Sequence, residues 1–238
     1  MFHLIERYLP SASTFSGDID FVFSLIFWVV GAWFVATEGV FFWLILRFRK
    51  QPGVKAQYIT GELEHEKKWV HWPHMAVLVF DVIILIAAVR VWHMVKQDLP
   101  PAQETVRVVA QQWAWSFVHP GPDGQLDTPD DIKTVDDLHV KVDTHYHFKL
   151  ESRDVLHSFS VPVFRLKQDV IPGRVITGWF EATQTGSFDI QCAEICGIGH
   201  ALMPARIVVE TAPEHTAWMA SQSPISVAAL ASPPAAQE

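Results

Sequence analysis

Residues 192–203 read CAEICGIGHALM and contain both cysteines of the chain, followed by a histidine and a methionine. Two thiolates, an imidazole and a thioether are soft ligands, and this combination is typical of copper sites for electron transfer. A second histidine, His157, lies upstream in the stretch DVLHSF. Two bridging thiolates with one histidine each would hold two copper ions, so we expect the fold to bring residue 157 to this stretch.

Three other interpretations of the cysteines were weighed. Cysteines four residues apart can pair as a disulfide in an oxidising compartment, but a disulfide leaves His200 and Met203 unexplained. A zinc site has no use for a thioether, and the C-x3-C-x3-H spacing is not that of a zinc finger. A catalytic thiol needs one cysteine and a base rather than two cysteines. Copper is therefore the favoured interpretation.

Two apolar runs, at residues 19–46 and 75–95, precede this region. About 20 apolar residues cross a bilayer core, so each run predicts a transmembrane helix. Tryptophans lie in and beside both runs, several near the ends, where membrane interfaces favour them: residues 28, 33, 43, 69, 72 and 92. The alternative, two buried helices of a soluble protein, is disfavoured by the length of the runs.

Basic residues predict the orientation of this hairpin. The loop between the two runs carries most of the nearby positive charge, and only Arg7 precedes the first run; the loop residues are Arg47, Arg49, Lys50, Lys55, Lys67 and Lys68. Positive loops stay in the cytoplasm. Both chain ends are then outside, with the CAEICGIGHALM stretch on the oxidising, periplasmic side. We expect no cleavable signal peptide, because the first residues lack a basic start and a short apolar core.

The outer region is predicted to be a β domain. Short runs rich in Val, Ile, Phe and Thr predict strands at 104–110, 114–118, 138–142, 145–150, 175–180, 187–191 and 205–209. Several short strands at this spacing are typical of a β-sandwich or β-barrel. The predicted organisation is an outer segment 1–18, a helical hairpin 19–97, a β domain 98–210 and a tail 211–238. The tail is rich in Ala, Ser and Pro, so we expect it to be disordered.

The net charge of the predicted β domain distinguishes a nucleic-acid partner from a protein partner. Residues 98–210 contain 16 acidic and nine Lys or Arg residues, a net charge of −7. This sign argues against nucleic-acid binding and favours a basic protein partner. A solubilising surface remains an equally good explanation for any single carboxylate.

The two spans, the acidic β domain and the motifs DVLHSF and CAEICGIGHALM together resemble subunit II of the haem-copper oxidases, in its cytochrome c oxidase type. The resemblance runs from residue 19 to about residue 210 and is strongest from 154 to 206. It implies an α+β membrane protein: a two-helix transmembrane hairpin followed by a cupredoxin-like Greek-key β-barrel with a binuclear copper centre, CuA. It also implies the bacterial inner membrane, a cytochrome c donor, and subunits I (haem) and III as partners. The complex would reduce oxygen to water and pump protons.

The resemblance also implies residue roles. Cys192 and Cys196 would bridge both coppers, and His157 and His200 would each bind one. Met203 would be a weak ligand of one copper, and the backbone carbonyl of Glu194 a weak ligand of the other. The Glu194 side chain would reach a magnesium ion shared with subunit I.

Two further positions match the family. Trp113, in QQWAWS, falls where electrons enter from the donor, although spacing alone favours a core residue on the same strand face as Trp115. Glu66, before the second span, falls at the cytoplasmic mouth of a proton path, with a solvated charge beside Lys67 as the alternative. Arg153 departs from the family, because an acidic docking residue is expected there.

Other features leave alternatives open. Glu38, Asp81 and Arg90 lie within the spans, where charged groups usually face protein, so we expect them to contact subunit I or pair with one another. The acidic loop 120–137 could dock a donor, bind calcium or be a solvated loop. A CuA subunit of a nitric oxide reductase and a membrane-anchored copper carrier are the rival functions.

Overall fold

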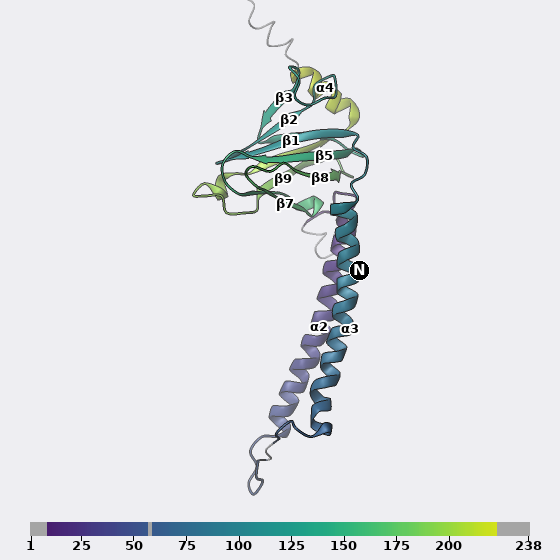
Figure 1. The fold of residues 1–238 in the computed structure, drawn as a ribbon, viewed down its shortest axis with the longest axis vertical. Coiled ribbons are helices and arrows are strands. Elements are labelled where there is room, and N and C mark those ends of the chain that lie inside the picture. The colour runs from purple at the N-terminus through teal and green to yellow at the C-terminus, as the bar shows by residue number, and fades with distance from the viewer. Residues whose placement is uncertain (1–8, 57–58, 223–238) are drawn as a thin grey trace, which may run out of the picture. The chain divides into compact units, whose positions relative to one another are not determined.

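The computed structural model describes residues 9–56 and 59–222. It divides into two compact units, residues 18–94 and the remainder of the chain on both sides of that segment. In the first unit, helix α2 (Ser16–Arg47) and helix α3 (Glu64–Trp92) run side by side, with Trp33 in edge contact with Phe80 at 6.2 Å (Figure 1). Both are long and apolar enough to cross a membrane, as predicted.

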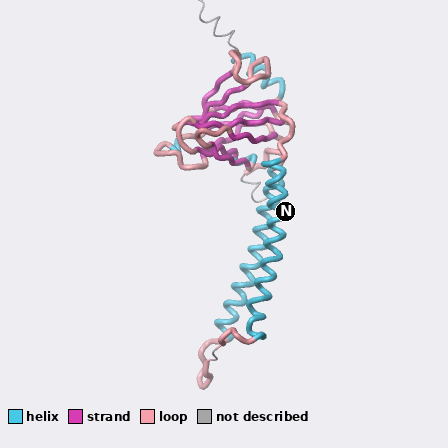
Figure 2. The backbone as a smooth tube through the Cα atoms, viewed as in Figure 1, coloured by secondary structure: helices cyan, strands magenta, loops and turns pink. Residues whose placement is uncertain are grey.

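In the second unit, the described residues form ten strands in two five-stranded sheets. Figures 1 and 2 show how these strands are arranged. One sheet has the order β3-β2-β1-β5-β8 and the other β4-β10-β9-β6-β7. The strands are β1 (Glu104–Gln111), β2 (Ala114–His119), β3 (Ile132–Val135), β4 (Asp137–Lys141), β5 (His145–Ser152), β6 (His157–Val161), β7 (Leu166–Val170), β8 (Ile176–Glu181), β9 (Gly186–Cys192) and β10 (Ala205–Glu210). Three short helical turns, η1 (His93–Gln97), η2 (Pro162–Phe164) and η3 (His200–Leu202), connect these elements.

The hydrophobic core follows the alternation of the strands. In β5, Tyr146, Phe148 and Leu150 are buried while their neighbours are only partly so, as period-two side chains require. The β1–β5 and β4–β10 pairs are parallel, and the other strand pairs are antiparallel. All seven predicted strands are present within one or two residues, whereas β3, β6 and β7 were not predicted.

Residues 9–17, which the sequence assigned to an outer segment, pack against the β unit. The Ala12 N–H donates to the Val163 carbonyl at 2.9 Å, and Ser13 forms an isolated bridge with Ala182. Phe15 is 2% exposed and meets the Trp179 ring edge-on at 5.2 Å. The chain therefore leaves this unit through α2 and returns to it after α3. Residues 1–8 lie outside the described residues.

The predicted disordered tail is wrong for residues 212–222, which form helix α4 (Ala212–Gln222). Trp218 on this helix stacks on His139 of β4 with ring centroids 4.1 Å apart, and His119 of β2 meets it edge-on at 5.0 Å. The helix is therefore held by tertiary packing, which composition does not reveal. Residues 223–238 of the predicted tail lie outside the described part of the chain.

Candidate metal centre

The predicted ligands converge at the ends of two neighbouring strands. His157 is the first residue of β6 and Cys192 the last of β9, and these strands pair antiparallel with Phe159 opposite Cys192. The remaining residues lie in the loop between β9 and β10, which projects from one end of the sheets (Figure 1). Strand pairing thus brings residue 157 to the cysteine stretch, as the sequence required.

Each donor atom lies within 3.8 Å of a cysteine sulfur. The two sulfur atoms, Cys192 Sγ and Cys196 Sγ, are 3.8 Å apart. His157 Nδ1 lies 3.8 Å from Cys192 Sγ, and His200 Nδ1 lies 3.7 Å from Cys196 Sγ. Met203 Sδ is 3.8 Å from Cys196 Sγ, and the Glu194 carbonyl oxygen is 3.3 Å from Cys192 Sγ. All six predicted ligands are therefore together, each presenting the atom type assigned to it.

These distances fit metal ligation rather than a disulfide. A disulfide needs sulfur atoms about 2.05 Å apart, and both cysteines are free. Two ligands about 2.3 Å from one metal ion at a tetrahedral angle are about 3.7 Å apart. The neighbouring sulfur and nitrogen donor atoms are 3.7–3.8 Å apart here. His157, Cys192 and Cys196 hold their ligand atoms within 4.8 Å of one another. The residues therefore fit soft metal ions held between them.

Burial affects the ionisation of one of the two thiols. His157 is fully buried and Cys196 is 3% exposed. Burial raises the pKa of the Cys196 thiol, and the neighbouring Cys192 raises it further because two adjacent thiolates repel. The positive charge of a bound metal ion would favour the Cys196 thiolate, and metal binding releases the thiol proton from such ligands.

Three residues that the sequence did not single out as functional support the ligand loop. Trp115 is fully buried, and its Nε1–H donates to the Met203 carbonyl at 3.3 Å. The Gln112 side chain donates from Nε2 to the Cys196 carbonyl at 2.7 Å. Asp154 accepts a hydrogen bond from His157 Nε2 at 2.8 Å. The i,i+3 spacing of Asp154 and His157 was the one available sequence signal.

The pKa of Asp154 reflects this environment. Partial burial raises it, but hydrogen bonds from His157 and from the Gln112 and Val155 N–H groups more than offset that effect. The pKa of the Asp154 carboxyl therefore lies below its ordinary value, and the group is an ionised acceptor at neutral pH.

Trp113 lies beside the ligand loop rather than in the core. Gln111 pairs with Ala114, so Gln112 and Trp113 form the turn between β1 and β2. Trp113 is 39% exposed, whereas Trp115 is fully buried, so the expectation that they share one strand face is wrong. A Cβ added at Gly199 would overlap the Trp113 ring, and one at Gly197 would lie 3.3 Å from it. The exposed indole is therefore packed on the backbone that holds the cysteines and His200.

Glu66 is not part of this cluster. It lies in the first turn of α3, where its carboxylate accepts the Gly61 N–H at 2.9 Å. Glu38 on α2 and Asp81 and Arg90 on α3 form no ion pair with one another, in a structure that describes all three. The option that these three residues pair within the chain is therefore wrong.

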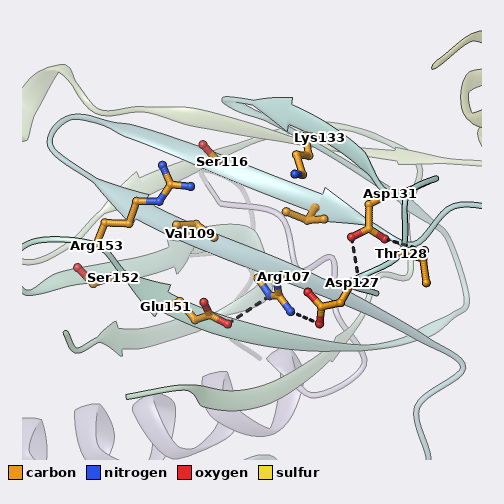
Figure 3. A pocket seen from close by; sticks show the side chains of 11 residues that line it. Arg107, Val109, Ser116, Asp127, Thr128, Asp131, Lys133, Glu151, Ser152 and Arg153 are labelled. Carbon is orange, nitrogen blue, oxygen red and sulfur yellow. Dashed lines mark hydrogen bonds and ion pairs between the residues drawn. The ribbon is translucent and has the colours of Figure 1, made fainter. Parts of the chain in front are cut away.

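The acidic loop folds over the outer face of the β3-β2-β1-β5-β8 sheet and covers a cavity of about 500 Å³ (Figure 3). Arg107 lies between two carboxylates there, 2.7 Å from Asp127 and 3.2 Å from Glu151. Asp130 and Asp131 accept hydrogen bonds from Thr128 and from loop N–H groups. Asp127 therefore ties the loop to the sheet through Arg107, and Asp130 and Asp131 make hydrogen bonds within the loop.

Comparison with known proteins agrees with this geometry. The sequence profile of the family described as "Cytochrome C oxidase subunit II, periplasmic domain" matches residues 104–212. The chain is 32% identical over 247 residues to the alternative cytochrome c oxidase subunit 2 of Bradyrhizobium diazoefficiens, covering 93% of this chain and 87% of that protein. It is 25% identical over 244 residues to cytochrome c oxidase subunit 2 of Cereibacter sphaeroides, covering 88% and 78%.

A solved structure, the periplasmic domain of subunit II of cytochrome oxidase from Bradyrhizobium japonicum, is 32% identical with a TM-score of 0.47, covering 52% of this chain and 96% of that one. The family matches confirm the predicted fold class, two apolar helices followed by a copper-binding, cupredoxin-like β domain, and do not favour the rival functions. The chain belongs to the cytochrome c oxidase subunit II family, whose members are parts of haem-copper oxidase complexes.

Proposed function

We propose that this chain accepts electrons one at a time from a periplasmic cytochrome c and delivers them to haem in subunit I of its oxidase. The observation that carries the proposal is the cluster of two cysteines, two histidines and a methionine with neighbouring donor atoms 3.7–3.8 Å apart. Cys192 and Cys196 would bridge two copper ions, His157 and His200 would each bind one, and Met203 and the Glu194 carbonyl would be the weak ligands. When bound, the copper pair supplies a centre that shares one electron.

The protein would hold the metal ligands rigidly and give the electron donor access to them. The ligands are held by paired strands and by hydrogen bonds that the Trp115 and Gln112 side chains donate to backbone carbonyls of the ligand loop, so their positions would change little between redox states. Trp113 offers an exposed aromatic face directly against the ligand loop, which suits it as the place where electrons enter. Arg153 donates to the Gln111 side chain at 2.9 Å, so the surface near Trp113 carries a positive group.

Exposed apolar residues of the ligand loop indicate where a partner subunit binds. Ile195, Ile198 and Leu202, in the same loop as Glu194, are 80%, 97% and 80% exposed. Such an apolar patch typically marks an interface, and we assign it to subunit I, with the Glu194 side chain reaching a shared magnesium ion. Glu38, Asp81 and Arg90 would likewise contact the membrane helices of partner subunits, including subunits I and III. Glu66 would stand at the mouth of the proton path that supplies pumping.

The orientation has two independent supports. Residues 9–17 and the β domain belong to one unit, so both ends of the hairpin lie on one side of the membrane. The basic loop between the helices then lies on the other side, which the positive-inside rule makes the cytoplasm. We therefore place the β domain in the periplasm and the helices in the bacterial inner membrane.

The test is purification of the full-length chain with its native partners, followed by copper analysis and electron paramagnetic resonance. Two coppers per chain with one electron shared between them is the expected result, and Cys192→Ser or Cys196→Ser should abolish that signal. A signal from a single cupric ion, or a zinc-filled site, would contradict the proposal. Co-purifying haem excludes a copper carrier, and turnover with oxygen rather than nitric oxide excludes a nitric oxide reductase.

A further inference from the structure

The two candidate histidine ligands have different surroundings. Both direct Nδ1 toward a cysteine sulfur, His157 toward Cys192 and His200 toward Cys196. The other ring nitrogen of His157 lies 2.8 Å from Asp154 Oδ1. For the corresponding nitrogen of His200, no hydrogen bond is formed with any residue that the structure describes. One half of the site therefore has a carboxylate behind its histidine, and the other half does not.

Asp154 is itself held in place from three directions. Its Oδ1 accepts the Val155 N–H at 2.7 Å in addition to His157 Nε2, and its Oδ2 accepts the Gln112 N–H at 2.7 Å. The Gln112 side chain in turn donates to the Cys196 carbonyl at 2.7 Å. Asp154 thus joins the strand that carries His157 to the turn that supports the cysteine loop.

We propose that Asp154 is a positioning residue for the metal centre, which orients His157 and fixes the Gln112 turn against the cysteine loop. This inference rests on the proposed function. A carboxylate oxygen that accepts the His157 Nε2–H holds the ring proton on that nitrogen, which would leave the Nδ1 lone pair free to bind a metal ion. Such carboxylate partners fix the ring plane of a ligating histidine and make it a stronger donor.

A different role for Asp154 has to be separated from this one. Its side chain is 29% exposed, so it would also be accessible to a basic electron donor as a docking charge. A docking charge changes the rate of encounter and its salt dependence but leaves the metal centre unchanged. A positioning residue changes the metal centre itself, whether or not a donor is present.

The experiment compares Asp154→Ala and Asp154→Asn with wild type in the purified full-length complex. Asp189→Asn is the matched control, because Asp189 is an exposed carboxylate on β9 and its substitution removes the same charge from the same domain. Measured for each are copper retained against a chelator, the electron paramagnetic resonance spectrum, the midpoint potential, and the KM for the donor.

We expect Asp154→Ala to weaken copper retention by about 10–100-fold and to alter the spectrum and potential. Asp154→Asn should lie between it and wild type, since its single amide oxygen can still accept one of the two backbone N–H groups, and Asp189→Asn should match wild type. If both Asp154 variants match Asp189→Asn in copper retention, spectrum and potential, and only the donor KM changes, the positioning role is overturned. If wild type itself lacks a two-copper signal, the proposed function fails and this inference with it.

Discussion

Trp113 and Trp115 are two residues apart but have opposite environments. Trp115 is fully buried and donates to the Met203 carbonyl, whereas Trp113 is 39% exposed and lies on the glycines of the ligand loop. Gly199 has φ −90°, which any residue can adopt, so its need for glycine is steric and not conformational. The absence of a side chain at residue 199 is what lets the indole approach the backbone of the metal loop.

Gly199→Ala should displace Trp113 and slow electron uptake from the donor, because the new Cβ overlaps the ring. Overpacking of this kind costs about 1–3 kcal/mol of folding stability. Gly178→Ala is the control, since its Cβ would overlap Phe148 in the core instead. Thermal unfolding should show a loss of stability in both variants. Stopped-flow reduction should show slower electron uptake only in Gly199→Ala. Equal uptake rates would contradict the role of this packing.

Met203→Leu should retain copper and raise the midpoint potential. Met203 is 2% exposed, and leucine conserves most of its volume, so the loss of stability should stay below about 1.5 kcal/mol. Removing the weak thioether donor takes electron density from the metal, which destabilises the oxidised state more than the reduced state. A redox titration with copper analysis checks this prediction; loss of copper, or an unchanged potential, would argue against Met203 as a ligand.

At the scale of elements, helix α4 is held by histidines on the β sheets. Trp218 stacks on His139, meets His119 edge-on and contacts His215 of its own helix at 5.4 Å. His139 Nδ1 lies 3.1 Å from Glu210 on β10. Burial, with His215 and His139 nearby, lowers the pKa of His119 from 6.5 to about 3, and burial also lowers that of His215. The His119 imidazole that meets the helix is therefore neutral at pH 7.

Acid should weaken this packing. Below pH 6.5 the unfolded chain protonates residue 119, whereas the folded protein does not until about pH 3, so the free energy of unfolding falls as pH falls through this window. The slope for one such group is at most about 1.4 kcal/mol per pH unit. His119→Phe should remove that part of the slope in urea unfolding at pH 7 and about pH 5. His145→Phe, at a half-exposed position, is the control, and identical slopes in all three proteins would refute the prediction.

At the scale of the whole molecule, residues 9–17 belong to the same unit as the β domain, although the α2–α3 segment separates them in sequence. Phe15 packs on Trp179, whose Nε1–H donates to the Val95 carbonyl at 3.1 Å. Ser13 Oγ donates to the Phe164 carbonyl at 2.9 Å. The segments that enter and leave the helical hairpin are therefore both attached to the β domain.

Phe15→Ala should destabilise the β domain by about 3–5 kcal/mol, the usual loss for a buried phenylalanine. Near-ultraviolet circular dichroism of the full-length chain in detergent, followed through a denaturant titration, measures this change. Phe15→Leu should recover part of the loss because it refills most of the cavity. Wild-type stability of Phe15→Ala would show that the N-terminal segment does not pack as described.

Local patterns in the sequence were sufficient for the spans, for seven of the strands and for the donor types of the metal centre. Long apolar runs and period-two alternation depend only on near neighbours in the chain, so they can be read directly. Strand β6, which carries His157, was not predicted because its five-residue sequence HSFSV contains only one β-branched and one aromatic residue, which is a weak strand signal. Helix α4 was missed because its stability comes from residues on β2 and β4.

The sequence by itself determined which ligands are available, which segments are long and apolar enough to cross a membrane, and which end of the helical hairpin is basic. Tertiary structure decided the rest: the pairing of β6 with β9 that places His157 beside Cys192, the turn that exposes Trp113, and the carboxylate of Asp154 behind one histidine. These features depend on contacts between residues far apart in sequence, and such contacts form only when burial of the two sheets fixes the strand order and register.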